Sequence, residues 1–199
     1  MNAFALPQPW KLVLASASPR RRGLLAAAGI ACTVRPAAVK EVRNGDEYPP
    51  DYVERLAREK ASAIEIGDDE IALGADTTVV VNELFDPEVL EKPRDEEDAR
   101  RMLKLLAGNK HLVMTGICLR RGDRIVTAVE KTTVHFGPMS LGEIDAYVAT
   151  GEPMDKAGAY AIQGVASRWI TRIDGCYFNV VGLPVARVWR ELILLLAQE

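Results

Sequence analysis

Cysteine is scarce in this chain of 199 residues, which contains only Cys32, Cys118 and Cys176 and no CxxC pair. Disulfide frameworks and zinc sites need paired or clustered cysteines, so the sequence favours neither. Widely spaced thiols are typical of a reducing compartment. We therefore expect a cytoplasmic protein whose cysteines pack in its core.

The chain also lacks an excess of positive charge and lacks long apolar runs. Its 25 lysines and arginines against 28 aspartates and glutamates give a net charge of -3, whereas nucleic-acid-binding proteins usually carry a basic surface. No apolar run reaches the length of a membrane span, and the first residues lack the basic and apolar regions of a signal peptide. We expect neither a nucleic-acid nor a membrane partner, and a homodimer stays open.

What is present is an ordinary globular composition, with 48% hydrophobic and 27% charged residues, in a chain long enough for a sizeable core. Strand-like segments alternate with helical ones in the first half and pair as hairpins in the second. This order predicts an α/β fold with a mixed twisted sheet, flanking helices and two lobes around a central cleft.

The expected strands are 11–17, 71–81, 89–90, 111–119, 125–136, 169–173 and 177–181, the last two paired as a hairpin. The expected helices are 18–28, 50–66, 95–108, 140–151 and a last one from 184. Ser18 before Pro19 is a favoured helix start, and Ser140 with Glu143 forms a capping box. The inward stripe of the last helix is expected to be Val185, Val188, Trp189, Leu192 and Leu196.

A carboxylate lies inside an apolar strand, at Asp76 in LGADTTVVV. A buried, unpaired charge costs several kcal/mol, so Asp76 needs a metal ion, a cation or a catalytic role. Lys60 falls on the inward face of the helix expected at 50–66, where it has the same problem with the opposite sign. The plainer alternative is that Asp76 and Lys60 form an ion pair.

Three arginines follow Ser16 and Ser18 where the first strand gives way to a helix. The free N–H groups at a helix start attract anions, whereas arginine is mildly unfavourable there. The cluster of Arg20, Arg21 and Arg22 is therefore better explained if an oligophosphate binds to it. The alternative is that the three side chains are solvated or form ion pairs with acidic neighbours.

Weaker signals come from three other segments. Lys92, in EKPR after a short strand, could reach into a cleft or belong to a solvated charge run. Glu41 could supply a second oxygen ligand to magnesium, which commonly takes one or two carboxylates. The small residues of segment 155–164 would allow a flat ligand to approach the backbone closely, and Gln163 could form hydrogen bonds with the edge of a nucleotide base. The alternative is that this segment is an ordinary loop.

Five motifs follow one another in the chain, namely SASPRR, GADT, EKPRD, DKAGAYAIQG and FNVVGLP. In order and spacing they resemble the Maf nucleotide pyrophosphatases over nearly the whole chain. Only about the first eight residues fall outside the match. We therefore expect a single Maf-like domain over residues 1–199, with residues 1–8 as an N-terminal extension.

The resemblance implies a mixed α/β fold with a cleft, dependence on a divalent cation (Mg²⁺ or Mn²⁺), and cleavage between the α and β phosphates of a nucleotide. It implies that Asp76 is the catalytic base and, with Glu41, a metal ligand. It assigns substrate choice to Arg20, Thr77 and Gln163, and the phosphate region to Ser16, Arg21, Lys60 and Lys92.

The form DKAGAY…IQG resembles the branch of the family that acts on dTTP and UTP. Two features depart from that branch: Ala161 replaces a usual glycine, and the segment NELFDPE lengthens a hairpin. The alternatives are a 7-methyl-GTP pyrophosphatase of the same family and a nucleotide-sensing regulator of cell division without turnover. The sequence does not choose between a role in cleaning the nucleotide pool and a role in division control.

Overall fold

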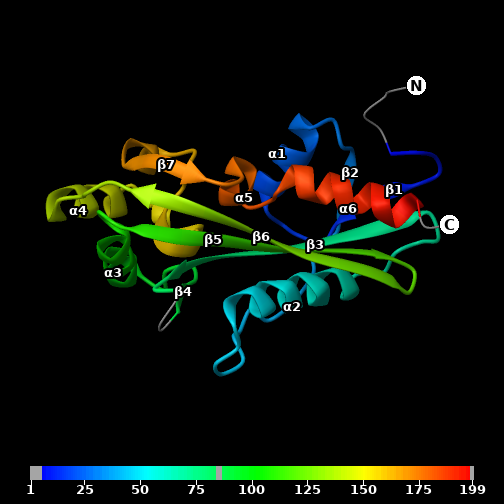
Figure 1. The fold of residues 1–199 in the computed structure, drawn as a ribbon, viewed down its shortest axis with the longest axis horizontal. Coiled ribbons are helices and arrows are strands. Elements are labelled where there is room, and N and C mark those ends of the chain that lie inside the picture. Colours follow the sequence, from blue (N-terminus) through cyan, green and yellow to red (C-terminus); the bar gives the residue numbers. More distant parts are fainter. Residues whose placement is uncertain (1–5, 84–86, 198–199) are drawn as a thin grey trace. The chain divides into compact units, whose positions relative to one another are not determined.

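A computed structural model describes residues 6–83 and 87–197, which form a seven-stranded mixed sheet with flanking helices (Figure 1). This confirms the predicted fold class. The strands are β1 (Lys11–Leu14), β2 (Cys32–Val34), β3 (Glu70–Val81), β4 (Glu88–Leu90), β5 (Lys110–Arg121), β6 (Arg124–Phe136) and β7 (Ile170–Asp174). Their order in the sheet is β2-β1-β3-β5-β6-β7, and β4 pairs with β3. The α-helices are α1 (Pro19–Ala27), α2 (Pro49–Ser62), α3 (Glu96–Leu106), α4 (Leu141–Ala149), α5 (Tyr177–Val181) and α6 (Val185–Ala197), with short 3-10 turns η1 (Glu152–Asp155), η2 (Ala157–Ala159) and η3 (Val165–Arg168).

The chain divides into two compact units, which we name unit 1 and unit 2. Unit 1 holds the described residues up to 76, together with 115–130 and the described residues from 182 onward. Unit 2 holds the described residues of 77–114 and 131–181. The expectation of one domain over the whole chain, and that of a cleft between two lobes, stay predictions.

In unit 1, β1 pairs in parallel with both β2 and β3. Figure 1 shows α2 on one face of these strands and α1 and α6 on the other. The helix α2 can lie unusually close to the sheet because two facing residues are glycines. A Cβ atom on Gly74 would lie 2.1 Å from the Ala57 carbonyl oxygen, and one on Gly116 would lie 2.2 Å from that of Val53.

The ends of the first two helices follow from local hydrogen bonding. Ser18 caps α1 by accepting from the Arg21 N–H, with proline at the first helical position as predicted. The helix α2 ends at Ser62, whereas the sequence predicted an end near residue 66. At this end the Arg120 guanidinium binds the carbonyl oxygen of Ala61 at 3.0 Å and that of Ile64, beyond the helix, at 2.6 Å, so the Ala61 carbonyl has a partner outside the helix.

In unit 2, β4 pairs with β3 and β7 pairs with β6, both antiparallel. The core lies between these strands and the helices α3 and α4, and it includes Val79, Leu103 and Tyr147. The capping box predicted for Ser140 and Glu143 is present at the start of α4. The lengthened hairpin NELFDPE falls partly on residues 84–86, which lie outside the described residues.

One predicted strand is wrong. Residues 177–181 were expected to pair with residues 169–173, but they form the helix α5, and β7 pairs with β6 instead. The reason lies in Asn179, which is buried and donates to the Val113 carbonyl oxygen at 3.0 Å and to Thr132 Oγ1 at 2.9 Å. A strand would alternate its side chains to the two faces, while one helical turn holds Asn179 against these partners.

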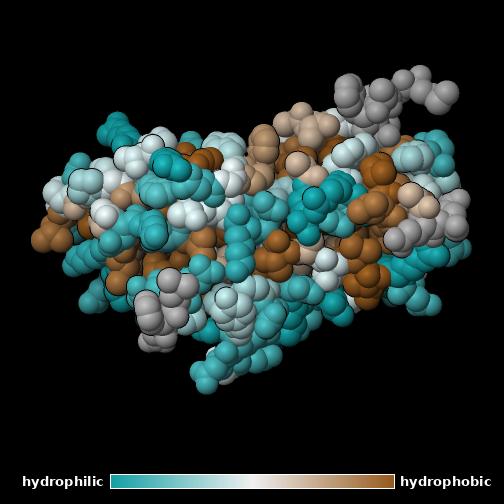
Figure 2. Space-filling view, viewed as in Figure 1, coloured by the Kyte–Doolittle hydropathy of each residue, from teal (hydrophilic) through white to brown (hydrophobic). Residues whose placement is uncertain are grey.

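The last helix, α6, buries Val188, Leu192 and Leu195, so its inward stripe departs from the predicted one, which ended at Leu196. Figure 2 shows hydrophobic residues gathered over α6, where Ile193 and Leu194 are exposed. Within the described residues, no helix combines the length and apolar character needed to cross a membrane.

Candidate functional site

Three charged side chains predicted for the site meet in unit 1. Lys60 Nζ lies 2.6 Å from Asp76 Oδ1 and 2.6 Å from Glu41 Oε1. Lys60 and Asp76 are both buried, with 7% and 5% of their surface exposed, while the Glu41 side chain is 37% exposed. The ion pair that the sequence offered as the plainer alternative is therefore present, and it includes a second carboxylate.

The close approach of α2 to β3 explains how this cluster forms. Side chains two residues apart in a strand point to the same face, so Asp76 points to the face of β3 on which Gly74 admits the α2 backbone. Lys60 lies one turn after Ala57, the residue whose carbonyl oxygen faces Gly74. Its ammonium group thus reaches Asp76 because the glycine leaves no side chain between helix and strand.

The start of α1 supplies the second part of the site in unit 1. Arg21 Nη1 donates to Ser16 Oγ at 3.1 Å, and Arg21 Nε donates to the Gly182 carbonyl oxygen at 2.9 Å. Ser16 Oγ also accepts from the Ser18 N–H at 3.2 Å. These bonds fix the Arg21 guanidinium between the first strand-to-helix junction and the GLP segment that precedes α6.

Electrostatics couples Arg21 to the carboxylate cluster. Burial lowers the pKa of Arg21, and the charges of Asp76 and Glu41 act against that lowering, while Arg20 adds to it. Arg20 is half-buried in the same first turn of α1. Unit 1 therefore gathers a buried acid, a buried lysine and a fixed arginine at a helix start, the arrangement expected for binding an anion next to a reactive carboxylate.

The residues of unit 1 fit a divalent cation to a limited degree. Among the described residues, no group of three histidine, cysteine, aspartate or glutamate side chains is placed to hold a metal ion. Asp76 and Glu41, however, contact the same ammonium nitrogen, so two carboxylates converge on one point of unit 1. Two carboxylates suffice for Mg²⁺ when substrate phosphates and water complete its shell.

The remaining predicted site residues lie in unit 2. Thr77 follows Asp76 directly and is half-buried, whereas Lys92 and Gln163 are exposed. The neighbour of Lys92, Glu91, accepts from Thr78 Oγ1 at 3.2 Å through its side chain and from the Gly158 N–H at 3.2 Å through its backbone. The motifs EKPRD and DKAGAYAIQG are therefore joined by a backbone hydrogen bond.

Sequence reasoning missed two polar residues next to Gln163. Tyr147 and Glu152 contact each other and the backbone on both sides of Gln163, at Ala161 and Val165. Their bonds to the loop are made to main-chain groups, which no residue pattern reports.

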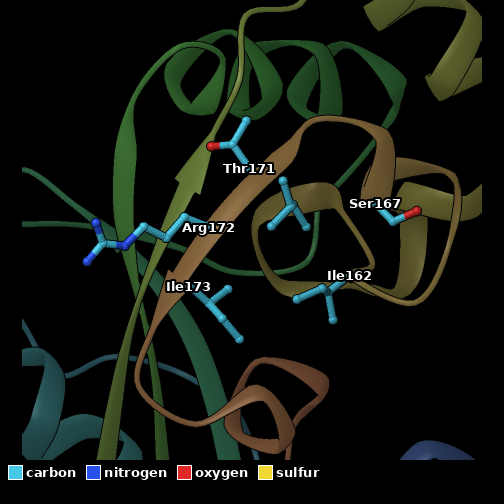
Figure 3. Close-up of a pocket in the computed structure, with 6 residues that line it drawn as sticks. Ile162, Ser167, Thr171, Arg172 and Ile173 are labelled. Carbon is cyan, nitrogen blue, oxygen red and sulfur yellow. The ribbon is translucent and has the colours of Figure 1, made fainter.

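Unit 2 also contains a shallow, largely apolar pocket of about 250 Å³. Figure 3 shows it between Ile162 and the strand that carries Thr171 and Ile173, with Arg172 pointing away. Ile170 and Ser167 complete its lining. None of the predicted site residues lines this pocket, so it does not extend the site.

Fold and site together define a mixed α/β protein with a buried acid and lysine beside an anion-attracting helix start. The family model for Maf-like protein matches residues 11–195, and the chain belongs to this family. It is 52% identical to the dTTP/UTP pyrophosphatase of Koribacter versatilis (strain Ellin345), over 91% of this chain and 92% of that one. It is 45% identical to the dTTP/UTP pyrophosphatase of Bacillus cereus (strain AH820), over 92% of this chain and 94% of that one.

Among solved structures, the Staphylococcus aureus Ham1 protein aligns with a TM-score of 0.44 and 17% identity, over 80% of this chain and 93% of that chain. This likeness is too distant for its site to be compared with the one described above.

Proposed function

We propose that this protein hydrolyses dTTP and UTP to the nucleoside monophosphate and pyrophosphate. The observation that carries the proposal is the cluster of Asp76, Lys60 and Glu41 in unit 1, in which a buried carboxylate lies beside a lysine and a second carboxylate. Relatives at 52% and 45% identity over nine-tenths of the chain are named for the same activity, which supports the choice of substrate.

In this proposal Asp76 takes the proton of the attacking water, which reacts at the α-phosphorus. A general base must be ionised and must lie within hydrogen-bonding reach of the water proton. Lys60, at 2.6 Å, compensates the charge of the buried Asp76 carboxylate. Arg20, Arg21, Lys60 and Lys92 would neutralise the charge of the leaving pyrophosphate. Preorganised donors of this kind are each worth about a hundredfold in rate.

A divalent cation, Mg²⁺ or Mn²⁺, completes the proposal, with Glu41 and Asp76 as its protein ligands. When bound with the nucleotide it would supply positive charge to the phosphate oxygens. Both ions accept hard oxygen ligands, so the carboxylates do not choose between them. The convergence of both carboxylates on the Lys60 nitrogen is the feature that supports this assignment.

Base selection is proposed for Gln163, together with Arg20 and Thr77. A primary amide both donates and accepts, so it can pair with the imide edge that uracil and thymine share. A site that hydrogen-bonds its substrate rejects ligands without the partner groups far more strongly than it senses one methyl group. We therefore expect UTP and dTTP to be used about equally.

A panel of nucleotides tests the proposal. The protein is assayed for pyrophosphate release with UTP, dTTP, 7-methyl-GTP and the common purine triphosphates, in EDTA and after addition of Mg²⁺ or Mn²⁺. We expect activity with UTP and dTTP only when metal is added. A kcat/KM for 7-methyl-GTP equal to or above that for UTP would contradict the substrate assignment.

The same panel addresses the remaining alternatives. Binding of UTP without any pyrophosphate release would favour a nucleotide-sensing regulator, and activity that survives EDTA would remove the metal from the proposal. A role in cleaning the nucleotide pool of the cytoplasm is part of the proposal, because hydrolysis converts a triphosphate that polymerases use into a monophosphate that they do not use.

A further inference from the structure

The loop that carries Gln163 is anchored on both sides by one pair of side chains in unit 2. Tyr147 Oη accepts a hydrogen bond from the Ala161 N–H at 3.3 Å and donates to Glu152 Oε1 at 2.7 Å. The second carboxylate oxygen, Glu152 Oε2, accepts from the Val165 N–H at 3.1 Å. Gln163 lies midway between the two anchored amides.

The loop is also fitted closely to the Glu152 carboxylate. The Gly164 N–H donates to the Ala161 carbonyl oxygen at 3.0 Å, which closes a turn around Gln163. A Cβ atom at Gly164 would lie 2.2 Å from Glu152 Oε1, so the carboxylate occupies the space that a side chain at 164 would need. This contact leaves little room for the turn to move toward Glu152.

Glu152 and Tyr147 are themselves fixed. The Glu152 N–H donates to Thr150 Oγ1 at 3.2 Å, and the Glu152 carbonyl oxygen accepts from Lys156 Nζ at 3.0 Å. Tyr147 is buried in α4, and burial, with the hydrogen bond to Glu152, raises the pKa of its hydroxyl. The phenol therefore stays a donor, and the carboxylate keeps its second oxygen for the Val165 amide.

We infer that Glu152 is a positioning residue for base selection, acting with Tyr147 to hold the backbone that presents the Gln163 amide. Because the Gln163 side chain is exposed, its position depends chiefly on the backbone that carries it. An error of about 1 Å in such a group can reduce catalysis a hundredfold, so rigid anchoring on both sides has a clear use. The inference rests on the proposed function, and it assigns a role to a residue outside the predicted site.

Steady-state kinetics of Glu152→Ala, Glu152→Gln and Tyr147→Phe with UTP and CTP tests this role. CTP differs from UTP on the base edge that Gln163 is proposed to read. In Glu152→Ala we expect the ratio of kcat/KM for UTP over CTP to fall about tenfold, mainly through a higher KM for UTP. Glu152→Gln keeps one acceptor and turns the other into a donor, so its loss should be smaller.

Asp145→Asn is the matched control, because this acidic residue lies on the exposed face of α4 and pairs with Arg100. Its ratio for UTP over CTP should equal that of the wild type. A thermal melt of each variant shows which are folded, and Glu152→Gln, which keeps the shape of the side chain, serves if Glu152→Ala does not fold.

Hydrogen exchange of the free protein gives a readout that does not need activity. The Ala161 and Val165 amides should exchange at least tenfold faster in Glu152→Ala, while those within α4 keep their wild-type rates. Unchanged exchange, or an unchanged ratio for UTP over CTP, would overturn the inference. A wild-type protein that does not hydrolyse UTP would instead overturn the proposed function, and the exchange rates would still test the anchoring.

Discussion

The two units bury polar groups in different ways. Unit 1 buries charges: Asp76 and Lys60 form an ion pair at 2.6 Å, with Glu41 on the same nitrogen. Unit 2 buries a neutral pair, in which His111 Nε2 and the Tyr160 hydroxyl are hydrogen bonded at 2.8 Å. Its buried carboxylate, Asp98, pairs with the exposed arginines Arg94 and Arg101 and not with a buried cation. Only the first arrangement retains the cost of desolvating two buried ions, while the second leaves His111 Nδ1 buried without a hydrogen-bond partner among the described residues.

The neutral pair has no part in the proposed chemistry, which we assign to the charged cluster of unit 1. Burial lowers the pKa of His111 to about 3 and raises that of Tyr160, so the pair stays neutral in the aromatic core beside Phe136. A neutral pair of this kind contributes to packing and to the uniqueness of the core. Well-packed apolar residues can often replace a buried ion pair without loss of stability. The Asp76–Lys60 pair is therefore better explained by a functional need than by a need for stability.

The largest effect is expected when the acid of the charged cluster is neutralised. Asp76→Asn keeps the shape of the side chain and removes its charge, so turnover of UTP should fall at least about a hundredfold while the protein remains folded. Turnover is measured by pyrophosphate release, with the exposed Asp68→Asn as control. A variant that keeps more than about a tenth of the wild-type rate would remove Asp76 from the role of base.

Deleting the cation of the cluster should reduce stability. Lys60→Met leaves Asp76 buried without its nearest positive charge, and we expect the free energy of unfolding in urea to fall by about 3 kcal/mol. The double variant with Asp76→Asn should recover at least half of that loss, because no charge then needs compensation. Equal stability of Lys60→Met and the wild type would show that the carboxylate does not depend on Lys60.

The neutral pair should respond to pH instead. His111 keeps a pKa of about 3 in the folded state against an ordinary value of 6.5, so on acidification the unfolded chain binds a proton first. Stability is thus retained above about pH 6.5 and lost as the pH falls toward 3. The groups that act on the ring are Tyr160 and His135.

Urea unfolding at pH 7 and pH 5 measures this effect. Between these values the wild type should lose about 2 kcal/mol more than His111→Phe, which has no ring nitrogen to protonate. The comparison uses the change with pH within each protein, so a constant packing difference cancels. Equal losses in the two proteins would mean that His111 is not held neutral.

The smallest effect is expected at the exposed edge of the charged cluster. Glu41→Gln replaces one of the two proposed carboxylate ligands by a neutral amide. The Mg²⁺ concentration for half-maximal activity should therefore rise about tenfold, with a smaller change in kcat at saturating metal. The exposed Asp123→Asn, in the turn between β5 and β6, is the control. An unchanged Mg²⁺ requirement would remove Glu41 from the metal site.

Local signals predicted much of the fold. Ser18 with Pro19 and the capping box of Ser140 with Glu143 fix helix starts through neighbours in the sequence, so both were correct. Tyr177–Val181 was wrong because its aromatic and β-branched residues favour a strand, while the buried Asn179 decides the outcome through contacts with Val113 and Thr132.

The site was predicted unevenly for the same reason. Asp76 and Lys60 were recognisable because a charge in an apolar pattern requires an explanation, and the structure joins them. Glu41 carried no pattern of its own and enters the cluster through a loop. Glu152 could not be found from the sequence, because it binds main-chain N–H groups whose positions depend on the folded loop.

Hydrolysis of UTP in water enriched in ¹⁸O tests the central claim most directly, since it reports both the bond cleaved and the atom attacked. The wild-type protein with Mg²⁺ should release UMP and pyrophosphate in equal amounts, with the label in the phosphate of UMP, because water activated by Asp76 attacks the α-phosphorus. Label in the pyrophosphate, or release of orthophosphate and UDP, would contradict the account.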